Sequence, residues 1–135
     1  MWLVKTEPSS YSWDDLVSEG RTVWDGVKNP AALKQMAAMK KGDAVFVYHT
    51  GGEKAVVGVG RVDKGPYPDP ALGDPRRLVF DLAAGKPLTR PVTLSELRSQ
   101  PAFSGSPLVR QGRLSVLSIT PPQWKVIETL ARSNP

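Results

Sequence analysis

Short apolar runs alternate along this chain with clusters of glycine, proline, serine and asparagine. Apolar runs of this length, bounded by turn-forming residues, are typical of strands. The predicted strands are 2–5, 21–24, 43–49, 56–62, 78–84 and 113–119. The fifth of these is expected to turn at Gly85. Gly58 and Gly60 lie inside the fourth, which indicates a bulge, a close approach to the backbone or, as we favour, the bend of a barrel.

Each predicted helix follows a residue whose side chain can accept a hydrogen bond from the first helical turn. Ser12 with Asp15, and Thr93 with Glu96, have the spacing of a capping box. The helices are predicted over 13–19 with a stop at Gly20, from Asn29–Pro30 through Met39, from Thr93 to before Pro101, as a short turn at Ser106–Pro107, and after Thr120.

Two further segments carry expectations of their own. On the C-terminal helix Trp124, Ile127 and Leu130 share one face, so Trp124 is expected to lie in the core. Residues 64–77 contain Pro66, Pro68, Pro70 and Pro75 and are predicted to be the longest irregular stretch. An irregular stretch of this length in a compact domain is usually functional or disordered.

The order of these elements predicts the fold class. Strands and short helices are mixed without βαβ repetition, which indicates an α+β fold with a small, curved mixed sheet or barrel. The length of 135 residues predicts a single domain over 1–135.

Composition limits the classes of partner. A formal net charge of +5 favours a polyanionic partner, although many domains of this size carry a few excess charges. The basic residues are dispersed, with doublets only at Lys40–Lys41 and Arg76–Arg77, so we expect weak attraction to phosphate rather than tight nonspecific binding. With no cysteine, no signal peptide and no membrane-length apolar run, we expect an intracellular monomer, cytoplasmic or nuclear if eukaryotic, without cofactor, metal or membrane contact.

The stretch 2–29 is rich in aromatic and short polar residues. It holds three of the four tryptophans, Trp2, Trp13 and Trp24, more aromatic surface than one strand or helix needs. Aromatic faces beside hydrogen-bonding side chains are typical of a pocket for a flat heterocycle. Tryptophan is also a common core residue, and both interpretations remain open.

The motifs KTEP, YSWDDL, WDGVKN, MKKGDAVFVYH, YPDP, RPVTLSEL and RLSV follow one another in this chain. Together, and in this order, they resemble the EVE domain, a member of the PUA-like superfamily and a relative of the YTH domain. The resemblance runs from Trp2 to about Ile127. It implies a PUA-like mixed β pseudobarrel with short flanking helices, and a pocket that takes a modified nucleobase in DNA or RNA.

The resemblance also implies the residues of that pocket. Trp24 is the candidate stacking face, and Lys5, Ser12 and Asn29 are candidates to contact the base edge, sugar or phosphate. The complete set that the motifs imply is Lys5, Thr6, Ser12, Trp24, Asn29, Tyr48, His49, Tyr67 and Arg113. Ser12 and Asn29 also have helix-capping roles that would account for them alone.

This chain departs from the family pattern at two places. EVE domains usually read VRNYQARN where residues 27–34 here read VKNPAALK. The tryptophan that commonly follows YPDP is absent, with Arg77 or Leu78 in its place. If that tryptophan forms a wall of the pocket, the wall must be built differently here.

Catalysis is the competing interpretation. Cysteine chemistry is excluded, and the single histidine does not support a Ser-His-Asp triad or a zinc site. The adjacent Lys5, Thr6 and Glu7 are similar to the Lys, Thr and Glu used by ASCH-domain amidohydrolases on modified cytidine. Successive strand residues point to opposite faces, however, which would separate Thr6 from the other two. We therefore expect a non-enzymatic binder of a modified base; the alternatives are a small amidohydrolase and a small-molecule sensor.

Overall fold

A six-stranded, strongly curved sheet forms the centre of the computed structural model, which describes residues 1–133. In chain order the elements are β1 (Trp2–Thr6), α1 (Trp13–Glu19), β2 (Arg21–Trp24), α2 (Pro30–Ala37), β3 (Ala44–His49), β4 (Ala55–Pro68), β5 (Leu78–Thr93), α3 (Leu94–Arg98), the 3₁₀ turn η1 (Pro101–Phe103), α4 (Pro107–Arg110), β6 (Val116–Ser118) and α5 (Pro121–Arg132). The α+β class and the PUA-like sheet with short helices are confirmed.

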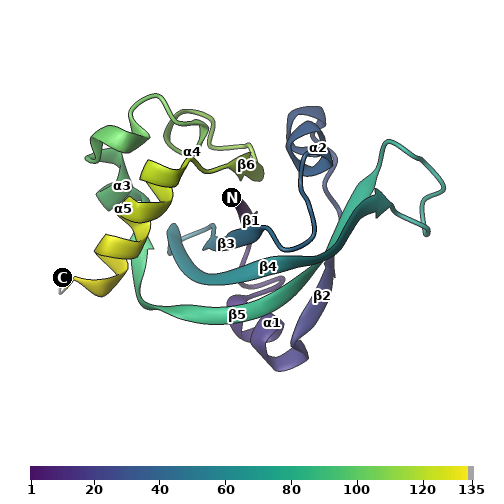
Figure 1. The fold of residues 1–135 in the computed structure, drawn as a ribbon, viewed down its shortest axis with the longest axis horizontal. Coiled ribbons are helices and arrows are strands. Elements are labelled where there is room, and N and C mark those ends of the chain that lie inside the picture. The colour runs from purple at the N-terminus through teal and green to yellow at the C-terminus, as the bar shows by residue number, and fades with distance from the viewer. Residues whose placement is uncertain (134–135) are drawn as a thin grey trace.

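The strands lie in the order β2-β5-β4-β3-β1-β6, with β1 parallel to β3 and the other neighbours antiparallel. β4 and β5 form two long curved ribbons across the molecule (Figure 1). Their pairing shifts register at four places, and such bulges bend and twist a strand. The bulges therefore give the sheet its curvature.

The predicted irregular stretch over 64–77 is wrong in its first part. β4 continues to Pro68, so that only residues 69–77 connect it to β5. Proline fits inside β4 because the register shifts between Lys64 and Tyr67, and a bulge leaves a residue outside the hydrogen-bonded ladder.

The predicted turn at Gly85 is also wrong, because β5 runs through this residue to Thr93. A Cβ atom on Gly85 would collide with the carbonyl oxygen of Val59 on β4. Glycine at this position allows the neighbouring strands β4 and β5 to lie close together. It does not reverse the chain.

Two smaller differences concern the ends of elements. The predicted strand over 113–119 is reduced to β6, because the backbone before it forms a turn in which the Leu114 N–H donates to the Gln111 carbonyl. α2 ends at Ala37 rather than Met39, where the Met39 N–H donates to the Met36 carbonyl and tightens the last turn. The predicted helix starts are confirmed, including the capping boxes of α1 and α3.

The sheet is covered on both faces. On one face the Trp13 ring of α1 lies directly over Gly58 of β4, where an added Cβ would be 2.5 Å from the ring. On the other face Trp124 of α5 stacks on Phe46 of β3, with ring centroids 3.7 Å apart. Phe46 is buried whereas Trp124 is half-buried, so this tryptophan closes the core from outside instead of lying within it.

The contact between Trp13 and Gly58 generates a test of the packing. We expect Gly58→Ala to lower the free energy of unfolding by about 1–3 kcal/mol, because the new methyl group requires the ring or the strand to move. The matched control is Gly52→Ala, at a loop glycine without atoms near the added methyl, where we expect a change within about 0.5 kcal/mol. Urea unfolding curves measure both, and equal stability of the two variants would contradict this packing.

Candidate functional site

A cavity of about 430 Å³ opens where the ends of β1 and β2 lie near each other. Pockets for small-molecule ligands fall in this range of volume. It is lined by residues from four segments, namely Lys5, Thr6, Tyr11, Thr22, Val23, Trp24, Asp25, Gly26, Val27, Lys28 and Ser115. The segments that carry KTEP, YSW and WDG in the sequence are thus brought together at one place.

Aromatic rings form one wall of this cavity. The Tyr11 ring meets Trp24 edge to face, with centroids 6.2 Å apart and planes at 86°. Behind Trp24, Phe80 of β5 lies roughly parallel to it at 6.4 Å. Trp24 is only 8% exposed, so its neighbours hold the indole in a fixed orientation. A flat ligand can therefore reach only the small part of the ring that faces the cavity.

Polar groups stand around the aromatic wall. The Thr6 hydroxyl donates to the Tyr11 carbonyl at 2.7 Å, which leaves its oxygen able to accept from a ligand. Asp25 and Lys28 are exposed at the cavity and supply one charge of each sign. The site can therefore offer hydrogen-bond acceptors, a carboxylate and a cation to a heterocycle and its phosphates.

Lys5 lines the cavity but directs its ammonium group elsewhere. The Nζ atom donates to the Gly112 carbonyl at 3.1 Å and lies 5.5 Å from the centroid of the Tyr48 ring. Burial lowers the pKa of this ammonium from its ordinary value. Lys5 is therefore a partly desolvated cation, which strengthens its interaction with any anion that reaches it.

Of the nine residues nominated from the sequence, Lys5, Thr6 and Trp24 line the cavity. Ser12 and Asn29 cap helices next to it. The Ser12 hydroxyl accepts from the Asp15 N–H of α1, and the Asn29 side chain accepts from Ala31 N–H at 2.8 Å in α2. Each of these caps directly follows a lining residue, Tyr11 before Ser12 and Lys28 before Asn29, and helps to fix its position.

Tyr48 and His49 of β3 lie beneath the site. Burial raises the pKa of the Tyr48 hydroxyl, whose ring supports the Lys5 ammonium. The His49 Nε2 accepts the Trp13 N–H at 2.9 Å, so Nδ1 carries the ring proton and donates to Glu53 at 2.6 Å. His49 thus anchors the first residue of α1 to the sheet.

Tyr67 and Arg113 are placed away from the aromatic wall. The Tyr67 hydroxyl donates to Asp81 at 2.6 Å, which raises the pKa of Tyr67 to about 12. Arg113 is exposed in the loop after α4, next to Gly112, whose carbonyl accepts from Lys5. Arg113 therefore follows a residue that contacts Lys5, but Arg113 itself does not line the cavity.

Several lining residues were missed by sequence reasoning, chiefly Tyr11, Thr22, Asp25, Lys28 and Ser115. Tyr11 and Asp25 lie within the same YSW and WDG motifs as the nominated residues, so the motifs themselves held the signal. Ser115 reaches the site because the Lys5 N–H donates to its carbonyl, a pairing between distant segments that no local pattern indicates.

The absent family tryptophan is not replaced by a residue at the equivalent place. Neither Arg77 nor Leu78 lines the cavity. The rings beside Trp24 are instead those of Tyr11 and Phe80.

The candidate catalytic group Lys5, Thr6 and Glu7 does not converge on one point. Glu7 is exposed and accepts from the Ser9 N–H and hydroxyl, while the Thr6 hydroxyl is directed to the Tyr11 carbonyl. The side chains thus have separate partners, as the strand alternation predicts. Within residues 1–133 no three His, Cys, Asp or Glu side chains gather in a way that could hold a metal ion.

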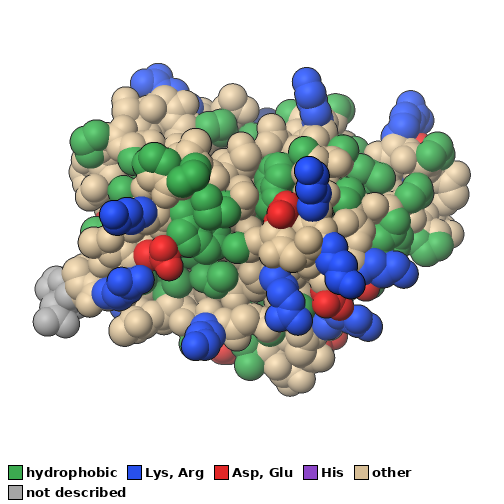
Figure 2. Space-filling view, in the orientation of Figure 1, with side chains coloured by type: hydrophobic (Ala, Val, Ile, Leu, Met, Phe, Trp, Pro, Cys, Tyr) green, Lys and Arg blue, Asp and Glu red, His purple; other side chains and the backbone are tan. Residues whose placement is uncertain are grey.

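Charges are spread over the surface. Figure 2 shows Lys and Arg side chains scattered across the visible face, with Asp and Glu among them. Arg21 and Arg61 both lie near Asp63, at 2.9 and 3.9 Å. Basic side chains thus lie on several parts of this face, and carboxylates lie among them.

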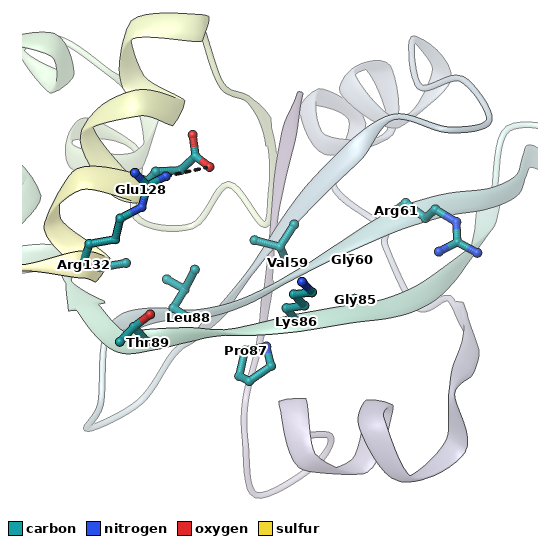
Figure 3. Close-up of a pocket in the computed structure, with 11 residues that line it drawn as sticks. Val59, Gly60, Arg61, Gly85, Lys86, Pro87, Leu88, Thr89, Glu128 and Arg132 are labelled. Carbon is teal, nitrogen blue, oxygen red and sulfur yellow. Dashed lines mark ion pairs between the residues drawn. The ribbon is translucent and has the colours of Figure 1, made fainter.

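A second cavity, of about 640 Å³, lies between α5 and the curved β4–β5 ribbons (Figure 3). Val59 and Leu88 form its apolar side, and on α5 Arg132 pairs with Glu128 at 3.8 Å. None of the 11 residues that line it is aromatic. A flat heterocycle would find no stacking partner there, so the smaller cavity beside Trp24 is the better candidate.

These features define an α+β domain of the PUA-like class with an aromatic-walled cavity at one edge of its sheet. The family profile of the EVE domain matches residues 1–130, and the chain belongs to this family. Among curated proteins, human thymocyte nuclear protein 1 is 28% identical over 169 residues, covering 99% of this chain and 75% of the human protein.

Solved structures agree with this assignment. Rpa0253 from Rhodopseudomonas palustris has a TM-score of 0.90 and 38% identity, covering 96% of this chain and 91% of that one. The human THYN1 protein, crystallised in complex with DNA containing 5-methylcytosine, has a TM-score of 0.88 and 26% identity, covering 99% of this chain and 98% of that one. Within residues 1–133 there is no helix long and apolar enough to cross a membrane.

The anchoring role of His49 can be tested directly. His49→Phe keeps a ring of similar size but removes the acceptor for the buried Trp13 N–H, and we expect a loss of about 1–3 kcal/mol in the free energy of unfolding. Glu53→Gln, which leaves the Nε2 acceptor in place, is the control, with an expected loss within about 0.5 kcal/mol. Guanidinium unfolding followed by tryptophan fluorescence gives both values. A His49→Phe protein as stable as the control would show that this hydrogen bond contributes nothing.

Proposed function

We propose that this chain binds a modified nucleobase in DNA, with the base inserted into the cavity beside Trp24 and without chemical conversion. One observation carries the proposal: three motifs on different elements of the fold meet at one cavity, which is large enough for a nucleobase and has an indole ring in its wall. The human relative crystallised with 5-methylcytosine DNA supports DNA, rather than a free metabolite, as the partner.

The composition of the cavity fits such a ligand. An extruded base stacks on aromatic side chains and forms hydrogen bonds along its edge. Trp24 supplies the stacking surface, and the Thr6 oxygen and the Asp25 carboxylate can accept hydrogen bonds, such as those of a cytosine amino group. Lys28, which is exposed at the cavity, can meet a flanking phosphate.

Replacement of Trp24 tests the stacking role. We expect Trp24→Leu to weaken binding to a duplex with a single 5-methylcytosine by about ten- to hundredfold, because base stacking contributes roughly 1–3 kcal/mol. The preference over unmodified duplex should be lost as well. Fluorescence anisotropy with labelled duplexes measures both. Leucine is chosen instead of alanine because it leaves a smaller cavity at this buried position and so limits the loss of folding stability.

Trp124→Leu is the matched control, because it is the same substitution on the opposite face of the sheet, where Trp124 stacks on Phe46. It should lose stability but keep the affinity and preference of the wild type. Thermal melts first establish that both variants are folded at the temperature used. Unchanged binding by Trp24→Leu would contradict the proposed site.

Salt dependence tests the contribution of phosphate. Because the cations near the cavity are few, we expect the logarithm of affinity to fall with the logarithm of salt concentration with a slope of roughly −2 to −4. Lys28→Ala should make the slope shallower by about one. Affinity independent of salt would point to a free small molecule as the ligand.

A further inference from the structure

The proposed function creates a requirement that the cavity alone does not meet. A base inside a duplex is stacked on its neighbours, and Trp24 is only 8% exposed, so the base must leave the helix to reach the ring. Extrusion leaves an empty place in the stack. Proteins that deform DNA commonly fill such a place with an apolar side chain inserted as a wedge.

One exposed apolar side chain is presented in a way that suits this role. Residues 69–77, which we call the arm, connect β4 to β5 and project from the body of the molecule (Figure 1). Leu72 lies in the arm and is 52% exposed, the largest value among the exposed large hydrophobic residues of the described chain. About half of this leucine is therefore open to a partner.

The arm holds this leucine on a stiff backbone. The Asp69 N–H donates to the Arg77 carbonyl at 2.8 Å and closes the arm at its base. The carboxylates of Asp69 and Asp74 each accept from a backbone N–H two residues later, at 2.9 Å, and Pro70 and Pro75 restrict the chain further. A preorganised arm loses little conformational entropy on insertion.

The position of the arm relative to the cavity follows from the strand register. Trp24 pairs with Phe80, and the arm begins where Pro68 pairs with Leu78, in the same strand as Phe80. At about 3.3 Å per residue this start lies about 7 Å along β5 from Phe80, and Leu72 is at most about 13 Å further. The sum, at most about 20 Å, is the length of about six base steps of roughly 3.4 Å, so Leu72 and the cavity can meet the same short stretch of duplex.

A cation accompanies the leucine. Arg76 is highly exposed and lies against Asp74 at 3.2 Å. Arg76 follows Leu72 in the arm and can meet a phosphate beside an opened step.

We propose that Leu72 enters the duplex at the place vacated by the extruded modified base, and that the arm thereby stabilises the open state that the cavity reads. This inference rests on the proposed function. It predicts that the arm matters for duplex DNA and not for single strands, in which a base is already free to enter the cavity.

The test compares Leu72→Ala with wild type on two probes of the same sequence, a duplex and a single strand that each contain one 5-methylcytosine. We expect Leu72→Ala to lose about tenfold or more in affinity for the duplex and to bind the single strand like wild type. A 2-aminopurine beside the modified base should brighten when wild type opens the duplex, and much less with Leu72→Ala. Val17→Ala, at a valine 50% exposed on α1, is the matched control and should behave as wild type.

The outcomes separate the two proposals. If wild type binds neither probe, the proposed function fails. If wild type binds both and Leu72→Ala weakens neither, or weakens both equally, the wedge is wrong while the cavity stands. Wild-type binding to the single strand alone would also overturn the wedge, because no duplex is then opened. Mispairing of the modified base should restore part of the Leu72→Ala affinity, since a weakened pair needs less help to open.

Discussion

The attachment of α1 to the sheet is the constraint on which the site depends. Trp13 at the start of α1 lies over the bare backbone of Gly58, and its N–H is held by His49 of β3. A side chain at position 58 would lift the ring and break this anchor. Tyr11 directly precedes Ser12, the N-cap of α1. The anchor at the start of this helix therefore also affects how Tyr11 lies against Trp24. The position of the aromatic wall therefore depends on how Trp13, at the start of α1, packs on the sheet.

The polar and aromatic groups of the cavity are supported by a second layer of residues beneath them. Residues that line the cavity offer an indole, a hydroxyl oxygen, a carboxylate and a cation. Residues beneath them, such as Tyr48 and His49, hold those groups in place through a cation–π contact and a buried hydrogen bond. Preorganisation of this kind lowers the ordering cost of binding, which matters for a protein whose dispersed charges contribute only modestly to affinity.

The long β4–β5 hairpin links the wall of the cavity with the arm. Its bulges curve the sheet around the core, Phe80 near its tip backs Trp24, and its tip forms the arm that carries Leu72. The proposed function and the proposed wedge together need two elements at a fixed separation. The hydrogen-bonded pair β4–β5 carries both, with Phe80 behind Trp24 and Leu72 in the arm.

Local chemistry along the chain was sufficient to predict the helix starts and the fold class, and the resemblance to the EVE domain indicated the segments that meet at the cavity. Capping boxes at Ser12 and Thr93 act within a few residues, so the sequence alone determines them. Tertiary structure decided the rest: β5 passes through Gly85 because Val59 lies against it, and Tyr48 and His49 serve as supports because β1 and α1 cover them. Ser115 joins the site only through its pairing with β1. A residue's partners across the sheet depend on register and curvature, which are set by the whole fold and leave no periodic signal in the sequence.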